Sequence, residues 1–147
     1  MSTVQNQNIE FTRNHIDKVF KTLTSSDNDL NQYFSDYLAK TYGDDSNERL
    51  HYIDIAEISK FIVGKFKTRQ VYFFPNFFSQ VETILANCDT YIDELIVVGL
   101  FEGIQNICGL DIDYYFGFDI WLLPLSKSKW DTLIDGWEGK NWRNRKQ

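Results

Sequence analysis

The sequence predicts an all-α fold, a single domain of six or seven helices. Apolar residues recur at helical spacing in five or more segments, so each of these segments has one face suited to burial. Capping-box patterns, in which a serine or threonine is followed three residues later by an acid, occur at residues 26–29, 90–93 and 128–131. With 147 residues, the chain is long enough to enclose one substantial core.

The centre of the expected fold is an antiparallel hairpin of two helices between Pro75 and Cys108. Pro75 suits the first turn of a helix, because the N–H that proline lacks would have no partner there. The capping box at Thr90 predicts the start of the second helix, and Gly109 predicts its end in a left-handed cap. This second helix would span about 28 Å at ~1.5 Å per residue, enough to cross a small domain.

The second helix of the hairpin contains Gly99 and Gly103, and glycine is unfavourable inside a helix. We expect both glycines on the buried face, where the missing side chains allow another helix to approach closely. The rest of that face is expected to be Ile92, Leu95, Ile96, Leu100, Ile104, Ile107 and Cys108. The outward side is expected to carry Glu94, Val98, Glu102, Gln105 and Asn106.

Other helices are expected on both sides of the hairpin. Their apolar stripes place them at residues 9–22, 26–43, 50–67 and 128–139. Successive helix pairs of similar size are compatible with a HEAT-like stacking. The expected organisation is a flexible N-terminus at residues 1–8, a single helical domain at 9–139 and a basic tail at 140–147.

The segment 110–125 has no clear helical period. It alternates in part and is rich in aromatic residues, which permits a short strand pair, an aromatic loop or a buried helix. We favour an irregular aromatic segment with some helix, ended by Pro124 and Ser126.

The charge is distributed unevenly along the chain. The net charge is −6, and residues 71–126 hold eight acids and no lysine or arginine. Residues 127–147 hold three acids and six bases. An acidic surface disfavours nucleic acid as a partner and favours the steering of a basic protein.

No motif for catalysis or cofactor binding is present. The chain has no glycine-rich phosphate loop and no serine nucleophile elbow. His15 and His51 have no second ligand at metal spacing, and the acids Asp111, Asp113 and Asp119 lack the glycine and final glutamate of a calcium loop. We therefore expect no enzyme activity, no cofactor and no metal.

The remaining sequence features concern the cellular location of the protein and the redox state of its cysteines. No apolar run is long enough to span a membrane, and the N-terminus lacks the pattern of a signal peptide. Cys88 and Cys108 are expected near opposite ends of one helix, too far apart for a disulfide. We expect a cytoplasmic protein with two reduced cysteines and no membrane contact.

Residues 94–106 have the sequence ELIVVGLFEGIQN, with a glycine, a large apolar residue, an acid and then Gln105-Asn106. This helix resembles the central helix of small bacterial immunity proteins, which accompany polymorphic and contact-dependent growth-inhibition toxins. The resemblance covers about residues 71–138 and has no shared catalytic residues. It implies a non-enzymatic protein that binds one cognate toxin, a nuclease-type or other C-terminal toxin domain, and neutralises it in the cytoplasm.

Two other readings of the residues stay open. A helical regulatory or scaffold domain could bind another protein or a small ligand, and an enzyme could use an unrecognised carboxylate site. The oligomeric state is not fixed by the sequence.

The expected toxin-binding face combines acids, which steer a basic partner, with aromatic side chains, which anchor it. Its candidate residues are Asp89, Asp93, Glu94, Glu102, Asp111, Asp113, Tyr114, Tyr115, Asp119 and Trp121.

Overall fold

The computed structural model describes residues 15–44 and 49–145, and these residues form helices and turns without a strand. The all-α prediction is confirmed. A first helical stretch covers residues 15–24. The elements that follow are α2 (Asn28–Tyr42), α3 (His51–Lys67), α4 (Phe74–Ala86), α5 (Thr90–Glu94), η2 (Leu95–Phe101), α6 (Glu102–Cys108), α7 (Pro124–Glu138) and η3 (Lys140–Arg145). Residues 1–8 and the start of the helix expected at residue 9 lie outside the described part.

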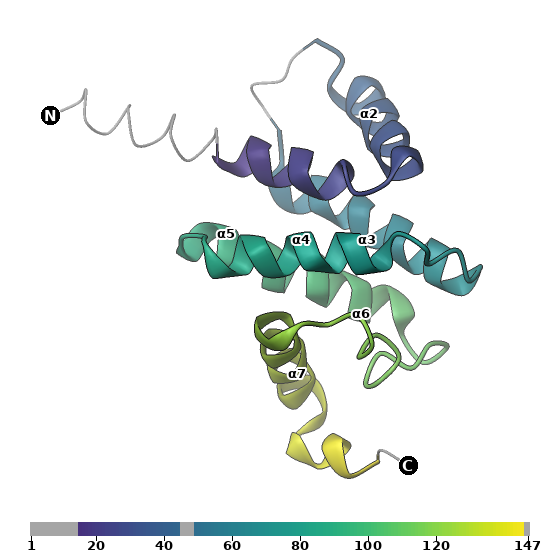
Figure 1. Cartoon of the computed structure of the whole chain (residues 1–147), viewed down its shortest axis with the longest axis vertical. Coiled ribbons are helices and arrows are strands. Elements are labelled where there is room, and N and C mark those ends of the chain that lie inside the picture. Colours follow the sequence, from purple (N-terminus) through teal and green to yellow (C-terminus); the bar gives the residue numbers. More distant parts are fainter. Residues whose placement is uncertain (1–14, 45–48, 146–147) are drawn as a thin grey trace, which may run out of the picture.

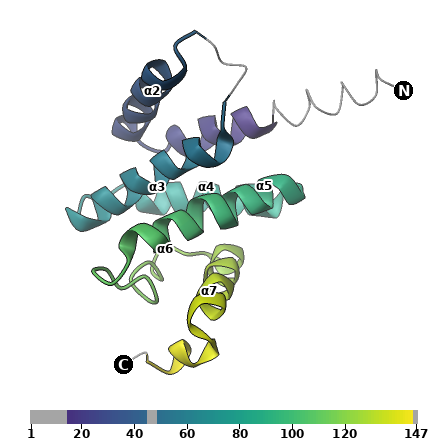
Figure 2. The ribbon, with the colours of Figure 1, turned by 180° about the vertical axis from the view of Figure 1, so that it is seen from behind.

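The helices are arranged in three levels (Figure 1). The middle level contains α3, α4 and the long helix that begins with α5, and the axes of all three are roughly aligned across the view, with the chain running along α4 in the opposite sense to the long helix. Residues 15–24 and α2 lie on one side of this level, and α7 and η3 lie on the other side (Figure 2). The closest helix packing joins α3 to η2 and α6.

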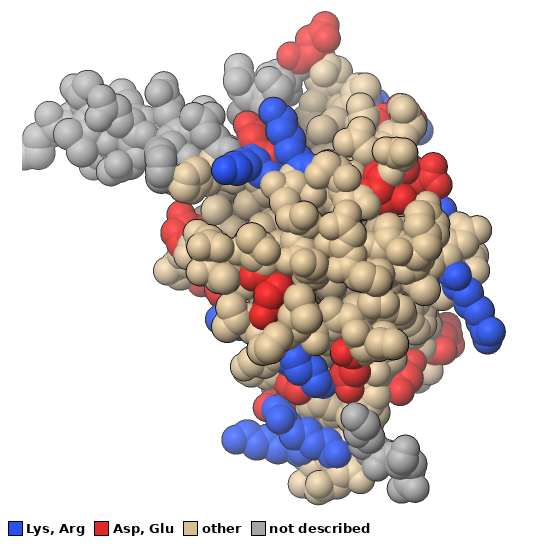
Figure 3. All heavy atoms as spheres, in the orientation of Figure 1, with Lys and Arg blue, Asp and Glu red and all other residues tan. Residues whose placement is uncertain are grey.

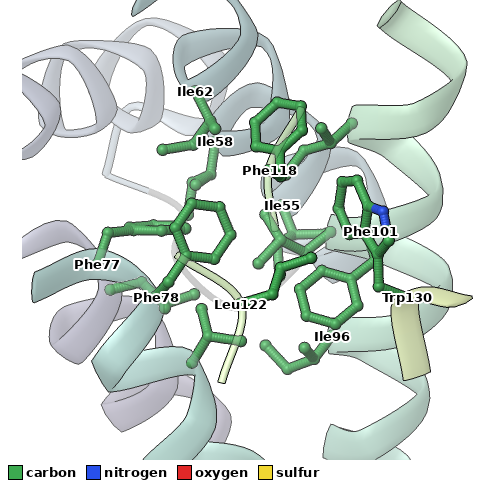
Figure 4. Close-up of a cluster of buried hydrophobic side chains, with 14 of the residues drawn as sticks. Ile55, Ile58, Ile62, Phe77, Phe78, Ile96, Phe101, Phe118, Leu122 and Trp130 are labelled. Atoms are coloured by element: carbon green, nitrogen blue, oxygen red, sulfur yellow. The ribbon is translucent and has the colours of Figure 1, made fainter. Parts of the chain in front are cut away.

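One core connects these levels. Ile55, Ile58 and Ile62 of α3 face side chains of α4, η2, α7 and the 109–123 segment (Figure 4). The buried side chains of these four segments in that view are Phe77, Phe78, Ile96, Phe101, Phe118, Leu122 and Trp130. The high aromatic content of the sequence is thus used mainly to fill the core.

The predicted helix from Thr90 to Cys108 is present as the continuous run α5–η2–α6, and its middle part, η2, is π-helical. Its glycines are packed as expected. A Cβ atom on Gly99 would lie 2.6 Å from Cγ2 of Ile55, and one on Gly103 would lie 2.7 Å from Oγ of Ser59. Both neighbours belong to α3, so the glycine face meets α3. The antiparallel hairpin with α4 as the centre of the fold, and the HEAT-like stacking, are not confirmed.

The helix predicted to start at Thr90 does begin there, but the capping residues of α2 and α5 differ from those that the capping boxes indicate. Asp27, and not Ser26, caps α2, and Asp89, and not Thr90, caps α5, each by accepting a backbone N–H of the first turn. In both places a carboxylate next to the predicted cap takes its role. The third capping box is wrong, because α7 begins at Pro124 and Ser128 lies inside the helix.

Two residues of the long helix lie on the other side from the one expected. Gln105 is 2% exposed, although the helical pattern predicts it on the outward side, and Ile107 is 38% exposed, although the pattern predicts it on the buried side. Gln105 is buried because its amide donates to the carbonyl of Trp130 and accepts from the indole of Trp137. Hydrogen-bonding groups on α7 thus satisfy a polar side chain that hydropathy alone would leave in water.

Part of the expected basic tail packs on the domain. Residues Lys140–Arg145 form a 3-10 helix, and Trp142 is 1% exposed. The indole of Trp142 donates to Asp135 of α7 at 2.7 Å, and Arg143 forms an ion pair with the same carboxylate. The core therefore continues beyond residue 139.

Two further properties follow from the described residues. Cys88 and Cys108 are free thiols, as predicted. No helix among the described residues is both long enough and apolar enough to cross a membrane.

Candidate functional site

The expected acidic face is partly neutralised in the fold. Asp93 pairs with Lys129 at 3.2 Å, and Asp119 pairs with Lys127 at 2.7 Å. Both lysines lie on α7, just beyond the segment that has no basic residue, and α7 returns along α4 and η2. Asp89 accepts the N–H of Ile92 as the cap of α5. These three carboxylates therefore have structural partners, and the acidic block is not one continuous negative surface.

The space-filling view agrees with this distribution. The middle of the face seen in Figure 3, over α4, is largely without charged side chains. Acidic and basic side chains are both present along its lower part, where α7 and η3 lie. Charge of one sign does not dominate this side of the molecule.

The other candidate acids lie at two ends of the long helix. Glu94 is exposed at the α5 end, near Tyr52, whose pKa is raised first by burial and then by the charge of Glu94. Asp111 is exposed beyond the α6 end. Glu94 and the end of α6 at Cys108 are separated by roughly 21 Å at ~1.5 Å per residue, and Glu102 is half-buried between them. The candidates thus do not converge on one site.

Trp121 belongs to the core. It is half-buried, and its ring lies 4.9 Å from that of Phe74 and 6.2 Å from that of Phe66, between centroids. The candidate anchor Trp121 therefore packs against the core, on rings of α3 and α4.

The structure does bring Asp113, Tyr114 and Tyr115 together, around a hollow of about 250 Å³. We call this feature the aromatic hollow. Its lining residues are Gly109, Leu110, Ile112, Asp113, Tyr114, Tyr115 and Glu138. The first six come from the irregular segment that follows α6, and Glu138 comes from the end of α7.

Local backbone chemistry shapes the irregular segment. Gly109 ends α6 with a φ of 53°, a left-handed conformation that glycine adopts without strain. Four residues later, the carboxylate of Asp113 accepts the backbone N–H groups of Tyr115 and Phe116 at 3.0 and 3.3 Å. This Asx-type turn presents both tyrosines to the hollow.

Indole and amide groups of α6 and α7 hold the hollow in place. The indole N–H of Trp130 donates to the carbonyl of Tyr114 at 2.9 Å. The amide of Gln105 donates to the carbonyl of Trp130 at 3.2 Å, and the indole of Trp137 donates to Gln105 at 3.0 Å. This series of hydrogen bonds fixes an irregular segment against two helices.

Tyr114 and Glu138 form the polar side of the hollow. The hydroxyl of Tyr114 donates to Glu138 at 3.3 Å. Burial raises the pKa of Tyr114 to about 12, with smaller contributions from Tyr115 and Glu138. The phenol therefore stays protonated and acts as a donor at neutral pH. Sequence reasoning missed Glu138, because it is 24 residues from Tyr114 and its own helix carries no signal for this contact.

Leu110 is the most exposed large apolar residue at the hollow. Its relative exposure is 105%, so the side chain is as accessible as in an extended peptide. Trp137, next to Glu138 in the sequence, is 48% exposed. Exposed apolar side chains beside a hollow and rimmed by polar groups are typical of protein-binding surfaces.

A second polar cluster lies between α2 and α3 and is structural. Asp54 is fully buried, and its carboxylate accepts the hydroxyls of Tyr37 and Tyr42 at 2.7 Å each and Nε of Arg49 at 3.0 Å. The guanidinium of Arg49 also lies over the ring of Phe20, 4.8 Å from its centroid. Asp54 is thus paired and hydrogen-bonded by its neighbours, which a buried carboxylate requires.

Across the described residues, no group of three or more histidine, cysteine, aspartate and glutamate side chains is placed to hold a metal ion. Asp111, Asp113 and Asp119 do not form such a group. His51 contacts the hydroxyl of Tyr91 at 3.5 Å.

Comparison with known protein families gives a match over most of the chain. The family described as Domain of unknown function (DUF7674) matches residues 20–138, which is most of the chain. No curated protein and no solved structure matches the chain at a significant level.

Proposed function

We propose that this chain, which belongs to the DUF7674 family, is an immunity protein that binds and neutralises a cognate bacterial toxin in the cytoplasm. The observation that carries the binding role is the aromatic hollow, where Leu110 is fully exposed next to Tyr114 and Tyr115. The toxin as partner rests on the resemblance of residues 94–106 to immunity proteins.

The composition of the hollow supports binding of a protein. Tyrosine and tryptophan are enriched at the energetic centres of protein interfaces, and polar groups form the rim. Tyr114 and Tyr115 supply the aromatic groups, and Asp113 and Glu138 supply the acids. A leucine that is exposed in the free protein gains hydrophobic free energy when a partner covers it, on the order of 2 kcal/mol for a complete side chain.

The mechanism needs no chemistry by this chain. The hydrogen bonds from Trp130 and Gln105 hold the hollow in one shape before the partner arrives, so little conformational entropy is lost on binding. A preformed face of this kind inhibits a toxin by covering its active site or by clamping a surface next to it.

The test is co-expression with the C-terminal domain of the protein encoded by the gene immediately upstream. We expect that domain to stop growth when expressed alone, and this protein to restore growth and to form a complex of defined mass with it. A toxic domain that the protein neither binds nor neutralises would contradict the proposal.

A pair of variants connects the test to the hollow. Leu110→Asp places a charge at its rim, and we expect loss of protection. Ile53→Asp is the matched control, because Ile53 is 56% exposed on α3 and does not line the hollow. The control should protect cells as well as the parent does. If the upstream gene encodes a metabolic enzyme that binds the same face, the alternative function of a regulatory or scaffold domain is favoured instead.

A further inference from the structure

We propose that the aromatic hollow is a receptor for one arginine side chain of the protein partner. The guanidinium would lie against the rings of Tyr114 and Tyr115 and pair with the carboxylates of Asp113 and Glu138. This inference rests on the proposed function in one respect, since the toxin would supply the arginine.

The size of the hollow favours a single side chain. Sites for small molecules and cofactors usually enclose about 300–1,000 Å³. The aromatic hollow measures about 250 Å³ and is bounded mainly by one short segment, residues 109–115, with Glu138 opposite. A nucleotide or a coenzyme would extend beyond it, whereas one side chain that projects from a partner surface can lie within it.

The charge of the lining favours a cation. Among the lining residues, the charged ones are Asp113 and Glu138, and both are acids. The other members are glycine, aliphatic residues and two tyrosines. An aromatic face attracts a cation through its quadrupole, and the attraction increases when the cation leaves water.

The hydrogen bonds already made by the two carboxylates leave room for a ligand. Asp113 uses Oδ1 for the turn, by accepting the N–H groups of Tyr115 and Phe116, and Oδ2 takes no part in these bonds. Glu138 uses Oε1 for the hydroxyl of Tyr114, and Oε2 takes no part in that bond. One oxygen of each carboxylate can therefore accept an N–H from the ligand.

Arginine fits this arrangement better than lysine. The guanidinium is planar, so it can stack on a tyrosine ring while its edge donates to carboxylates. The two tyrosine rings meet nearly at right angles, at 79°, with centroids 4.9 Å apart. They form an aromatic corner on the wall of the hollow, and Tyr115 packs on Trp142 as well, with 5.6 Å between ring centroids. Lysine presents a compact charge and gains less from a flat surface.

The test is a titration of the full-length, ¹⁵N-labelled protein with N-acetyl-arginine methylamide, followed by amide chemical shifts. We expect saturable shifts confined to residues 109–116 and 136–139, with a Kd on the order of millimolar for one side chain. The citrulline counterpart has nearly the same shape and no charge, and it should bind at least tenfold more weakly. The lysine counterpart should bind several-fold more weakly than arginine.

Two conservative variants test the acids. Asp113→Asn and Glu138→Gln keep a side-chain oxygen for the existing hydrogen bonds and remove the negative charge, so the shape of the hollow should persist. Each should weaken arginine binding, and the double variant should weaken it at least tenfold. Asp36→Asn, a change of an exposed acid on α2, is the matched control and should bind as the parent does. Retention of the parent spectrum outside the hollow verifies the fold of each variant.

The outcomes separate this inference from the proposed function. Equal binding of arginine and citrulline, shifts centred elsewhere, or unchanged binding by the double variant would overturn the arginine site. If the toxin is neutralised but arginine does not bind, the inference fails and the proposed function stands. If arginine binds as expected but no toxin is neutralised, the inference stands and the proposed function fails.

Discussion

The carboxylate of Glu82 on α4 accepts two hydrogen bonds from Ser126 on α7, one from its backbone N–H and one from its hydroxyl, each at 2.8 Å. The backbone N–H of Leu125 donates to the same carboxylate at 2.9 Å. Pro124, at the first position of α7, has no N–H to satisfy. A side chain from another helix thus caps α7, and the negative charge also opposes the positive end of the helix dipole. This contact fixes α7, and with it Glu138 at the far end, relative to α4.

We predict that Glu82→Ala destabilises the protein by about 0.5–2 kcal/mol, the range measured for loss of a helix cap. The N–H groups of Leu125 and Ser126 would lose their acceptor. Glu82→Gln keeps an acceptor oxygen and removes the charge, so it should cost less than alanine. Urea unfolding of the parent and the two variants measures the differences in the free energy of unfolding. Equal stability of the parent and Glu82→Ala would show that water replaces the carboxylate as acceptor without a loss of stability.

Stability should fall in acid, partly through Glu82. Burial alone would raise the pKa of Glu82, but the hydrogen bonds from Leu125 and Ser126 outweigh burial and lower it below the ordinary value of 4.5. The unfolded state therefore takes up the proton first as the pH decreases. The contribution of Glu82 is complete above about pH 4.5 and is lost as the pH falls through the pKa of the folded state. Urea unfolding at several pH values should show that the free energy of unfolding decreases less in acid for Glu82→Gln than for the parent.

A glycine exchange tests the contact between the long helix and α3. Gly103→Leu should cost about 1–3 kcal/mol or more, because even a Cβ atom would lie 2.7 Å from Oγ of Ser59. Gly136→Ala on α7 is the control, since no atom lies within 4 Å of its added Cβ. It should raise stability by roughly 0.5–1 kcal/mol, because alanine is the better helix former. A melting temperature of Gly103→Leu equal to that of the parent would contradict the packing described for α6.

The buried Asp54 should be among the most sensitive positions. Asp54→Ala would leave Arg49 without its close partner and two tyrosine hydroxyls without their acceptor. Breaking a buried ion pair in this way costs about 3–5 kcal/mol. Asp36→Ala, at an exposed position of α2, should change stability by less than about 0.5 kcal/mol. If the urea midpoints shift equally in the two variants, the cluster around Asp54 contributes little to the stability of the fold.

Much of the fold follows from the sequence, because helical periodicity records which side of each helix is buried. The helix at residues 90–108 and its glycine face illustrate this: two unfavourable glycines four residues apart indicate a close neighbour. Periodicity does not predict which helix this neighbour is, and in the structure it is α3. The cap of α7 was not predictable either, since Glu82 lies 44 residues before Ser126.

The candidate site was predictable only where its residues are adjacent in the sequence. The sequence identifies Asp113, Tyr114 and Tyr115 because acids flank an aromatic segment there, and the structure places these three residues around one hollow. Glu138 was missed because a tertiary contact brings it there. Trp121 lies in the same irregular segment. Because that segment has no helical period, the sequence does not predict that the side chain of Trp121 packs against the core.

Association with a basic toxin should depend on the acids of the hollow and on salt. Asp113→Lys and Glu138→Lys should reduce the association rate constant and make it less sensitive to ionic strength. The Debye length falls from about 10 Å at 0.1 M to ~3 Å at 1 M, so high salt should slow the parent as well. Asp36→Lys is the control and should behave as the parent does. Stopped-flow or surface-based kinetics give these rates, and lysine variants as fast as the parent would exclude steering by these acids.

Amide hydrogen exchange of the complex with the upstream-encoded toxin domain tests most directly whether the aromatic hollow faces the toxin. The proposed function predicts slower exchange at residues 109–116 and 136–139 on binding, and no change at the opposite end of the long helix around Tyr52 and Tyr91. Slower exchange around Tyr52 and Tyr91, with residues 109–116 unaffected, would contradict it.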